Sequence, residues 1–171
     1  MKQKIIALNK ITSKKIDDSY RVLFKTLTHT LRNIQHSLDR TDPILHEYQK
    51  DEVVSVQILQ IEINYIESSL ELCLTKLENF EKLLGEKYLA TIDKGTRKTK
   101  NAIYKKRRIF LAHYNLLNSE LFSLLDLIKQ NPSYIEEKAE RVDFLDTYTE
   151  TQNRLDYILD LLNATRKSLK L

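Results

Sequence analysis

The chain has 171 residues, with two glycines, two prolines and one cysteine, and its 28 basic residues nearly balance its 24 acidic residues. One cysteine excludes an internal disulfide and a cysteine-based zinc site, and a net charge of +4 is too small to indicate nucleic-acid binding by itself. So few turn-forming residues favour long helices over a sandwich or barrel, and the length suits one domain, residues 1–171.

The start of the chain, MKQKIIALNK, has an apolar run of only four residues and no small-residue cleavage pattern, so we expect no secretory signal. No segment approaches the apolar length that a membrane span needs. We therefore expect a cytoplasmic protein with no membrane partner. Residues 1–12 are expected to form a frayed segment that precedes the first helix.

Residues 13–40 are predicted to form the first helix. Their apolar residues recur at spacings of three and four, which place them on one helical face: Ile16, Tyr20, Leu23, Leu27, Leu31, Ile34 and Leu38. The pair Asp42-Pro43 then predicts the start of a second helix, because Asp caps free amides and Pro is tolerated at the first helical position.

The second helix is predicted over residues 43–90. An unbroken helix of that length would span roughly 70 Å, so we expect a break near Lys50-Asp51. Val54–Ile66 also alternates in a way that suits a strand, but the apolar seam continues beyond it and a lone strand would have no partner, so helix is favoured. Cys73 lies on the seam and is expected to be a buried core residue.

Residues 91–99 are predicted to form a loop that contains Gly95, and a third helix is predicted over residues 100–130. Asn131-Pro132 repeats the cap-and-proline signal and predicts a fourth helix over residues 132–167. Four helices with short links indicate an all-α protein, an antiparallel four-helix bundle.

Charge is unevenly distributed along the chain. Eight basic residues and no acidic residue lie between Lys94 and Arg108, whereas eight acidic residues and three basic residues lie between Glu136 and Asp160. Such asymmetry can steer an anionic ligand to one end of the protein, or let the two segments attract each other within the fold or across a dimer.

The segment RRIFLAH, from Arg107 to His113, carries an Arg followed after four to six residues by a His that Ala112 precedes. In a helical bundle this pattern resembles the HEPN family, which includes metal-independent ribonucleases of toxin–antitoxin and antiphage (abortive infection) systems. The resemblance implies a homodimer that acts on RNA without a cofactor, with a cognate antitoxin as a possible partner. It implies that His113 transfers protons and that Arg107 or Arg108 stabilises the phosphate.

The chemistry is consistent with those roles, because histidine titrates near neutral pH and a guanidinium offers a planar charged fork to phosphate oxygens. In one regular helix, however, Arg108 and His113 point about 140° apart. They converge only if the helix begins near Arg108 or if two copies build one site. The residues expected to guide RNA are Arg97, Lys98, Lys100, Tyr104, Lys105 and Lys106.

The alternative function is that of a non-enzymatic interaction protein, whose basic end binds nucleic acid or an acidic partner while His113 only packs. Whether the chain is an enzyme stays open at this point. His29 and His36 could share a face of the first helix, but no third ligand is evident, so we expect no metal site. No Gly-rich nucleotide-binding motif is present, and no cofactor is expected.

Overall fold

The computed structural model describes residues 2–49, 56–92, 96–130 and 138–171. They form four helices: α1 (Lys2–Gln49), α2 (Val56–Ile92), α3 (Arg97–Lys129) and α4 (Lys138–Ser168). No strand occurs in these residues, and the part of Val54–Ile66 that is described is helical from Val56. The predicted all-α fold is confirmed.

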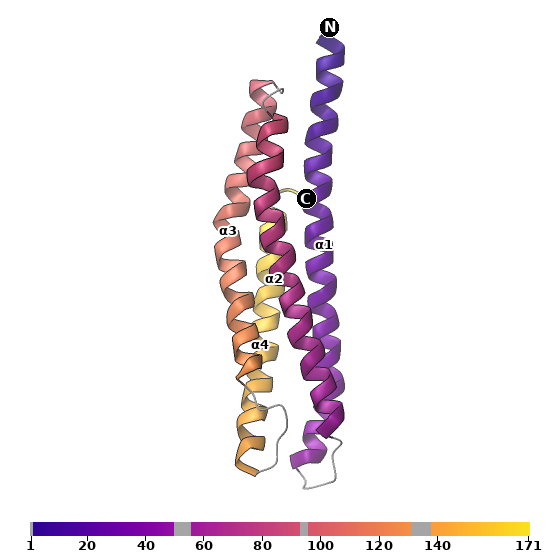
Figure 1. The fold of residues 1–171 in the computed structure, drawn as a ribbon, viewed down its shortest axis with the longest axis vertical. Helices are drawn as coiled ribbons and strands as arrows, with labels where there is room; N and C mark the ends of the chain where they lie inside the picture. Colours follow the sequence, from indigo (N-terminus) through magenta and orange to yellow (C-terminus); the bar gives the residue numbers. More distant parts are fainter. Residues whose placement is uncertain (1, 50–55, 93–95, 131–137) are drawn as a thin grey trace.

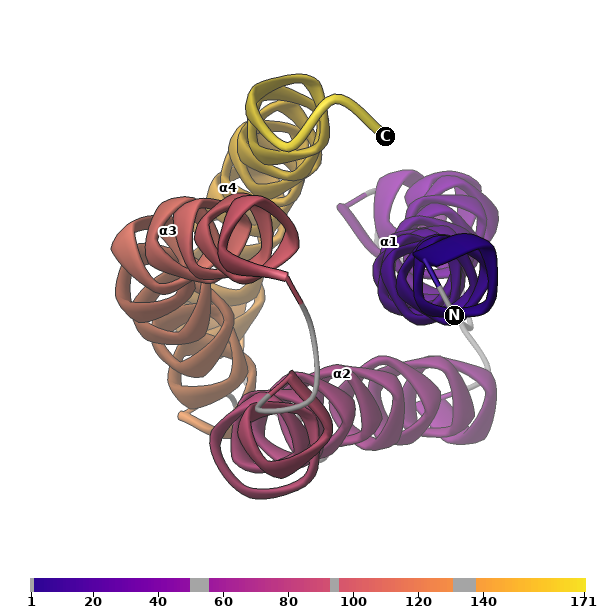
Figure 2. The ribbon, with the colours of Figure 1, turned by 90° about the horizontal axis from the view of Figure 1, so that it is seen from above.

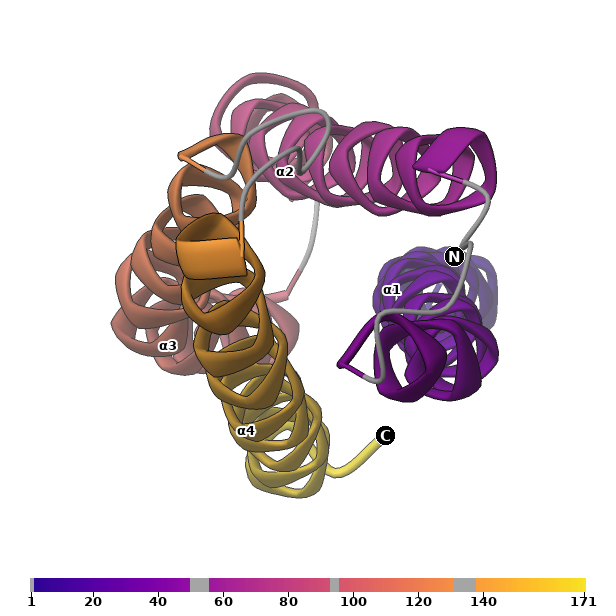
Figure 3. The same cartoon turned by 90° about the horizontal axis from the view of Figure 1, so that it is seen from below.

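The helices form an antiparallel four-helix bundle (Figure 1). Each helix packs on its neighbours in chain order, and α4 returns to pack on α1. Views from the two ends place α1 and α3 at opposite corners of the bundle (Figures 2 and 3). The predicted bundle layout is therefore confirmed, and α1 and α3 contact each other only weakly across the diagonal.

The boundary predicted at Asp42-Pro43 is wrong, because Pro43 lies inside α1, a single helix of 48 residues. This helix also begins at Lys2, so residues expected to form a frayed lead-in belong to it. Just before the proline, the Leu38 carbonyl accepts the Thr41 hydroxyl at 2.7 Å and the Tyr148 hydroxyl of α4 at 2.8 Å. Pro43 has no backbone N–H to donate within this part of α1, and the hydrogen bond from Tyr148 of α4 adds a contact one turn before it.

The break expected near Lys50-Asp51 falls between α1 and α2, in residues 50–55, which the structure does not describe. The loop expected over 91–99 is shorter, since α2 continues to Ile92 and α3 begins at Arg97. Thr96 caps α3, because its side-chain oxygen accepts the Thr99 backbone N–H at 3.4 Å. Helix four is described from Lys138, and the predicted Asn131-Pro132 cap lies outside the described residues.

The end of α4 is closed by a local hydrogen-bond pattern. Lys170 has a positive φ of 57° and donates its N–H to the Lys167 carbonyl, while the Leu171 N–H reaches the Arg166 carbonyl. This pair of bonds is the Schellman motif, in which a left-handed residue satisfies the last carbonyls of a helix. The chain turns there, and α4 stops beside the middle of α1 (Figure 1).

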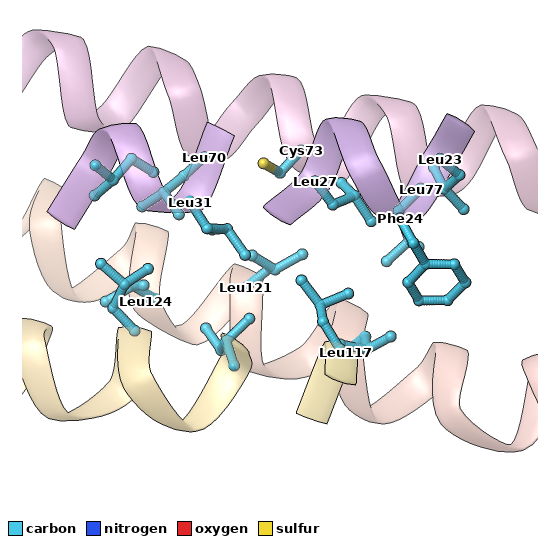
Figure 4. Close-up of a cluster of buried hydrophobic side chains, with 14 of the residues drawn as sticks. Leu23, Phe24, Leu27, Leu31, Leu70, Cys73, Leu77, Leu117, Leu121 and Leu124 are labelled. Atoms are coloured by element: carbon cyan, nitrogen blue, oxygen red, sulfur yellow. The ribbon is translucent and has the colours of Figure 1, made fainter. Parts of the chain in front are cut away.

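Leucine-rich layers fill the bundle, with side chains from all four helices pointing inward (Figure 4). Cys73 is fully buried among them, as the sequence predicted. An aromatic cluster adds to the core toward the start of α3. Phe110 lies 5.5 Å from Tyr20, 6.5 Å from Phe24 and 5.4 Å from Phe80, measured between ring centroids. One residue of α3 therefore contacts both α1 and α2.

Candidate nucleic-acid interface

The first third of α3 carries a solvent-facing stripe of basic, polar and aromatic side chains, which we call the α3 stripe: Arg97, Asn101, Tyr104, Lys105 and Arg108. All five are exposed, and Tyr104 retains 44% of its accessible surface. Asn101, Tyr104, Lys105, Arg108 and the partly buried Ile109 line a shallow depression of about 380 Å³. A ligand resting there would meet two cations and one aromatic ring.

Packing explains why the stripe faces water. Ile103 and Phe110 lie seven residues apart on the opposite face of α3 and are both buried. At 100° per residue, that anchor turns Arg97, Asn101 and Arg108 toward solvent. The stripe therefore follows from the apolar seam, and it rests on a helix that is capped at Thr96.

The predicted RNA-guiding cations do not share one environment. Arg97, Lys98 and Lys105 are exposed, and no ion pair involves them within the described part of the chain. Lys100 is only partly exposed. Lys106 turns inward and donates to Asp17 of α1 at 2.5 Å, with both side chains about three-quarters covered. Lys106 therefore links α3 to α1 across the bundle.

Arg107 is also partly buried, and its Nε atom has no hydrogen-bond partner among the described residues. A buried guanidinium donor without an acceptor is uncommon in folded proteins. Sequence reasoning could not find this feature, since it depends on how α3 packs. Sequence reasoning also missed Asn101 and Ile109, although Asn101 lies one helical turn after Arg97 and Ile109 one turn after Lys105.

Arg108 and His113 are not brought together within one chain. The helix that carries them begins at Arg97, eleven residues before Arg108, and continues unbroken to Lys129. Of the two arrangements that would let these side chains converge, the one that needs a helix start near Arg108 is absent. Arg108 faces solvent, while the partly buried His113 lies about 140° around the helix.

The described acidic side chains of α4 lie away from the basic start of α3. The helix α3 begins at the upper end of the bundle and α4 begins at the lower end, so the basic start of α3 and the described acidic first half of α4 lie far apart (Figure 1). Among the described side chains of that half, Glu150 pairs with Arg154 of its own helix. Among the described residues, no ion pair joins the acidic first half of α4 to the α3 stripe.

His29 and His36, the histidines considered as metal ligands, have separate surroundings on α1. His29 is exposed and lies 3.4 Å from the Asn33 side chain, and His36 Nδ1 is 3.9 Å from Asp39. No group of three potential metal ligands occurs in the described ranges. Among the helices as described, none combines the length and the apolar character needed to cross a bilayer.

The described residues form an all-α bundle in which one face of α3 carries exposed basic side chains. Comparison of the chain with protein-family models, curated proteins and solved structures gives no match.

Proposed function

We propose that this protein binds nucleic acid, RNA in the first instance, through the α3 stripe. The observation that carries the proposal is the stripe itself, in which cations without ion-pair partners in the described chain flank an exposed tyrosine over a shallow depression. Cations attract the phosphate backbone and a tyrosine ring stacks on unpaired bases, so the combination suits a single strand. Lys98 adds charge beside the stripe.

The physics of counterion release gives the proposal a quantitative form. Four phosphate contacts, from Arg97, Lys98, Lys105 and Arg108, give a slope of about −3 in a plot of log affinity against log salt for a single strand. Raising salt from about 50 to 200 mM then weakens binding roughly 50-fold. Binding by stacking or apolar contact alone would change far less.

Fluorescence anisotropy with a labelled single-stranded RNA tests this proposal. Lys105→Gln with Arg108→Gln removes two cations from the stripe, and we expect affinity on the order of 10-fold lower and a shallower salt slope. Lys76→Gln with Lys167→Gln is the matched control, since it removes two exposed cations from α2 and α4. Equal losses in the two variants would mean that total charge, and not the stripe, attracts RNA.

A second candidate is a HEPN-like metal-independent ribonuclease, the function that the Arg-to-His pattern implies. Two observations bear on its mechanism: Arg108 faces solvent, where another copy can approach, and the Arg107 Nε donor has no hydrogen-bond partner among the described residues. On this proposal a homodimer places Arg107 or Arg108 of one copy near His113 of the other. Proton transfer by His113 and charge stabilisation by arginine then cleave RNA.

Cleavage of a mixed RNA pool in EDTA tests the ribonuclease proposal. Wild-type protein should cleave, whereas His113→Ala and the double variant Arg107→Ala with Arg108→Ala should each be inactive with unchanged helicity. Mixing the two inactive variants should restore about a quarter of the activity, because half of randomly mixed dimers carry one intact composite site of two. Wild-type protein that binds RNA without cleaving it would leave the stripe as a docking surface alone.

A further inference from the structure

A second basic surface lies on the seam between α1 and α4, away from the α3 stripe. This groove has a volume of about 450 Å³. Its lining residues are Arg21, Lys25, Thr28, His29 and Arg32 from α1, and Asn163 and Arg166 from α4. We call it the α1–α4 groove. Two helices supply its walls, so its cations converge from two sides.

The charge balance inside the groove is strongly positive. Four lining residues are Arg or Lys, one is His, and none is acidic. Arg21 is engaged by Asp18 at 3.0 Å. Lys25, Arg32 and Arg166 make no ion pair in the part of the chain that is described. Three guanidinium or ammonium groups thus line one groove without an ion-pair partner among the described residues, which favours the binding of an anion.

The adjoining part of the same seam has the opposite character. A depression of about 360 Å³ farther along α1 and α4 is lined by Gln35, His36, Leu38, Asp39, Gln152, Asn153 and Asp156. There Asp156 accepts a hydrogen bond from Gln35 at 2.6 Å. Two carboxylates therefore lie in one depression, and the cations gather in the other. An anion would be repelled by the two carboxylates of that depression and attracted by the cations of the α1–α4 groove.

The side chains of the groove also indicate which anion fits. Two guanidinium groups on facing helices suit bidentate contact with phosphate oxygens, and the Thr28 hydroxyl and Asn163 amide add hydrogen-bond partners. The lining has no Phe, Tyr or Trp on which a base could stack. We infer that the α1–α4 groove binds a compact polyphosphate group carried by a small molecule, and that it recognises the phosphates and not the base.

This site is independent of the proposed RNA surface, because it uses no residue of α3. Its lining residues are mostly exposed, so affinity arises from several screened contacts acting together and should fall steeply with salt. The polyphosphate is compact enough for Arg32 and Arg166 to contact it together, whereas a single phosphate engages fewer of these groups. Tripolyphosphate should consequently bind at least about 10-fold more tightly than inorganic phosphate.

Isothermal titration of the full chain with tripolyphosphate at low salt is the experiment. We expect Arg32→Gln with Arg166→Gln to weaken binding at least 10-fold, and Lys105→Gln with Arg108→Gln to leave it within about twofold. Circular dichroism checks that both variants remain helical. Equal weakening in the two variants, or no binding by wild-type protein, would overturn the inference.

Two further titrations identify what the groove recognises. ATP and tripolyphosphate should bind with similar affinity and compete, because only phosphates are contacted; a much tighter ATP complex would contradict recognition of phosphate alone. RNA affinity should be unchanged in Arg32→Gln with Arg166→Gln. If that variant loses RNA binding while tripolyphosphate binding persists, the groove belongs to the nucleic-acid surface and the inference is wrong. Failure of the α3 proposal, in contrast, would not change the tripolyphosphate result.

Discussion

Cys73 illustrates how the bundle changes the chemistry of one residue. Its side chain is fully buried, and burial raises the pKa of the thiol to about 12. The thiolate is the reactive form, so we expect a thiol reagent at pH 8 to label the native protein on the order of 100-fold more slowly than the unfolded chain. Ellman's reagent with and without denaturant measures this ratio, and rapid labelling of the native protein would contradict a closed core.

The same shift gives Cys73 a defined effect on stability. Because the folded pKa is raised, the contribution of this thiol to stability is complete below the unfolded pKa, and it is lost as pH rises through the folded value. The neutral thiol is compatible with the buried site at physiological pH, whereas in strong alkali ionisation to the thiolate favours the unfolded state.

Glu62 is the corresponding case for acid. The hydrogen bond from Arg40 lowers the pKa of the Glu62 carboxyl, and the Ser37 hydroxyl also donates to it. A depressed carboxyl pKa gives stability that is present above the unfolded pKa and is lost as pH falls through the folded pKa. We expect Glu62→Gln to lower the melting temperature at pH 7, and this difference to shrink as the pH falls below 4. A constant difference across that range would exclude a role for the charge.

At the scale of elements, Pro43 is the position where a local signal and the fold disagree. Proline within a helix removes one backbone hydrogen bond and clashes with the preceding turn. We therefore expect Pro43→Ala to raise the free energy of unfolding by about 1–3 kcal/mol, measured by urea denaturation. A proline at the first position of a helix would give no such gain, so an unchanged or lower stability would show that α1 ends before Pro43.

This disagreement shows which parts of the fold the sequence could predict. Spacings of three and four identified the apolar faces, and predicted seam residues such as Leu27, Leu31 and Cys73 are buried. Those spacings identify the apolar face that each helix buries, and burial of these faces stabilises the bundle. Helix ends were predicted less well, because caps are local preferences that long-range contacts such as Tyr148 with Leu38 can override.

The candidate sites divide in the same way. Helical spacing alone places Arg97, Tyr104 and Arg108 on one face, so most of the α3 stripe could be read from the sequence. The pairing of Lys106 with Asp17, 89 residues away, depends on how two helices meet. The α1–α4 groove is similar, because Arg32 and Arg166 meet only after the fourth helix returns to the first.

At the scale of the whole molecule, the bundle has a four-helix part and a three-helix end. The last turn of α4 reaches the level of Arg21 and Lys25, since Arg166 shares a groove with them. Beyond that level, α1, α2 and α3 are the only described helices that continue (Figure 1). The α3 stripe begins in this end, so its position depends on fewer packing contacts than the rest of α3.

Phe110 is the main apolar anchor of that end, because its ring contacts Tyr20 and Phe24 of α1 and Phe80 of α2. We expect Phe110→Ala to cost about 3–5 kcal/mol of stability and to increase amide exchange over residues 97–109. The RNA affinity of this variant should fall although every cation remains, since an unanchored helix start must be ordered on binding.

Leu124→Ala, in the four-helix part, is the matched control. It should lower stability by about 2–5 kcal/mol but leave amide exchange at 97–109 and RNA affinity unchanged while the protein is folded. Equal exchange and binding in the two variants would mean that α3 is held as one rigid unit, and that the stripe does not rely on Phe110.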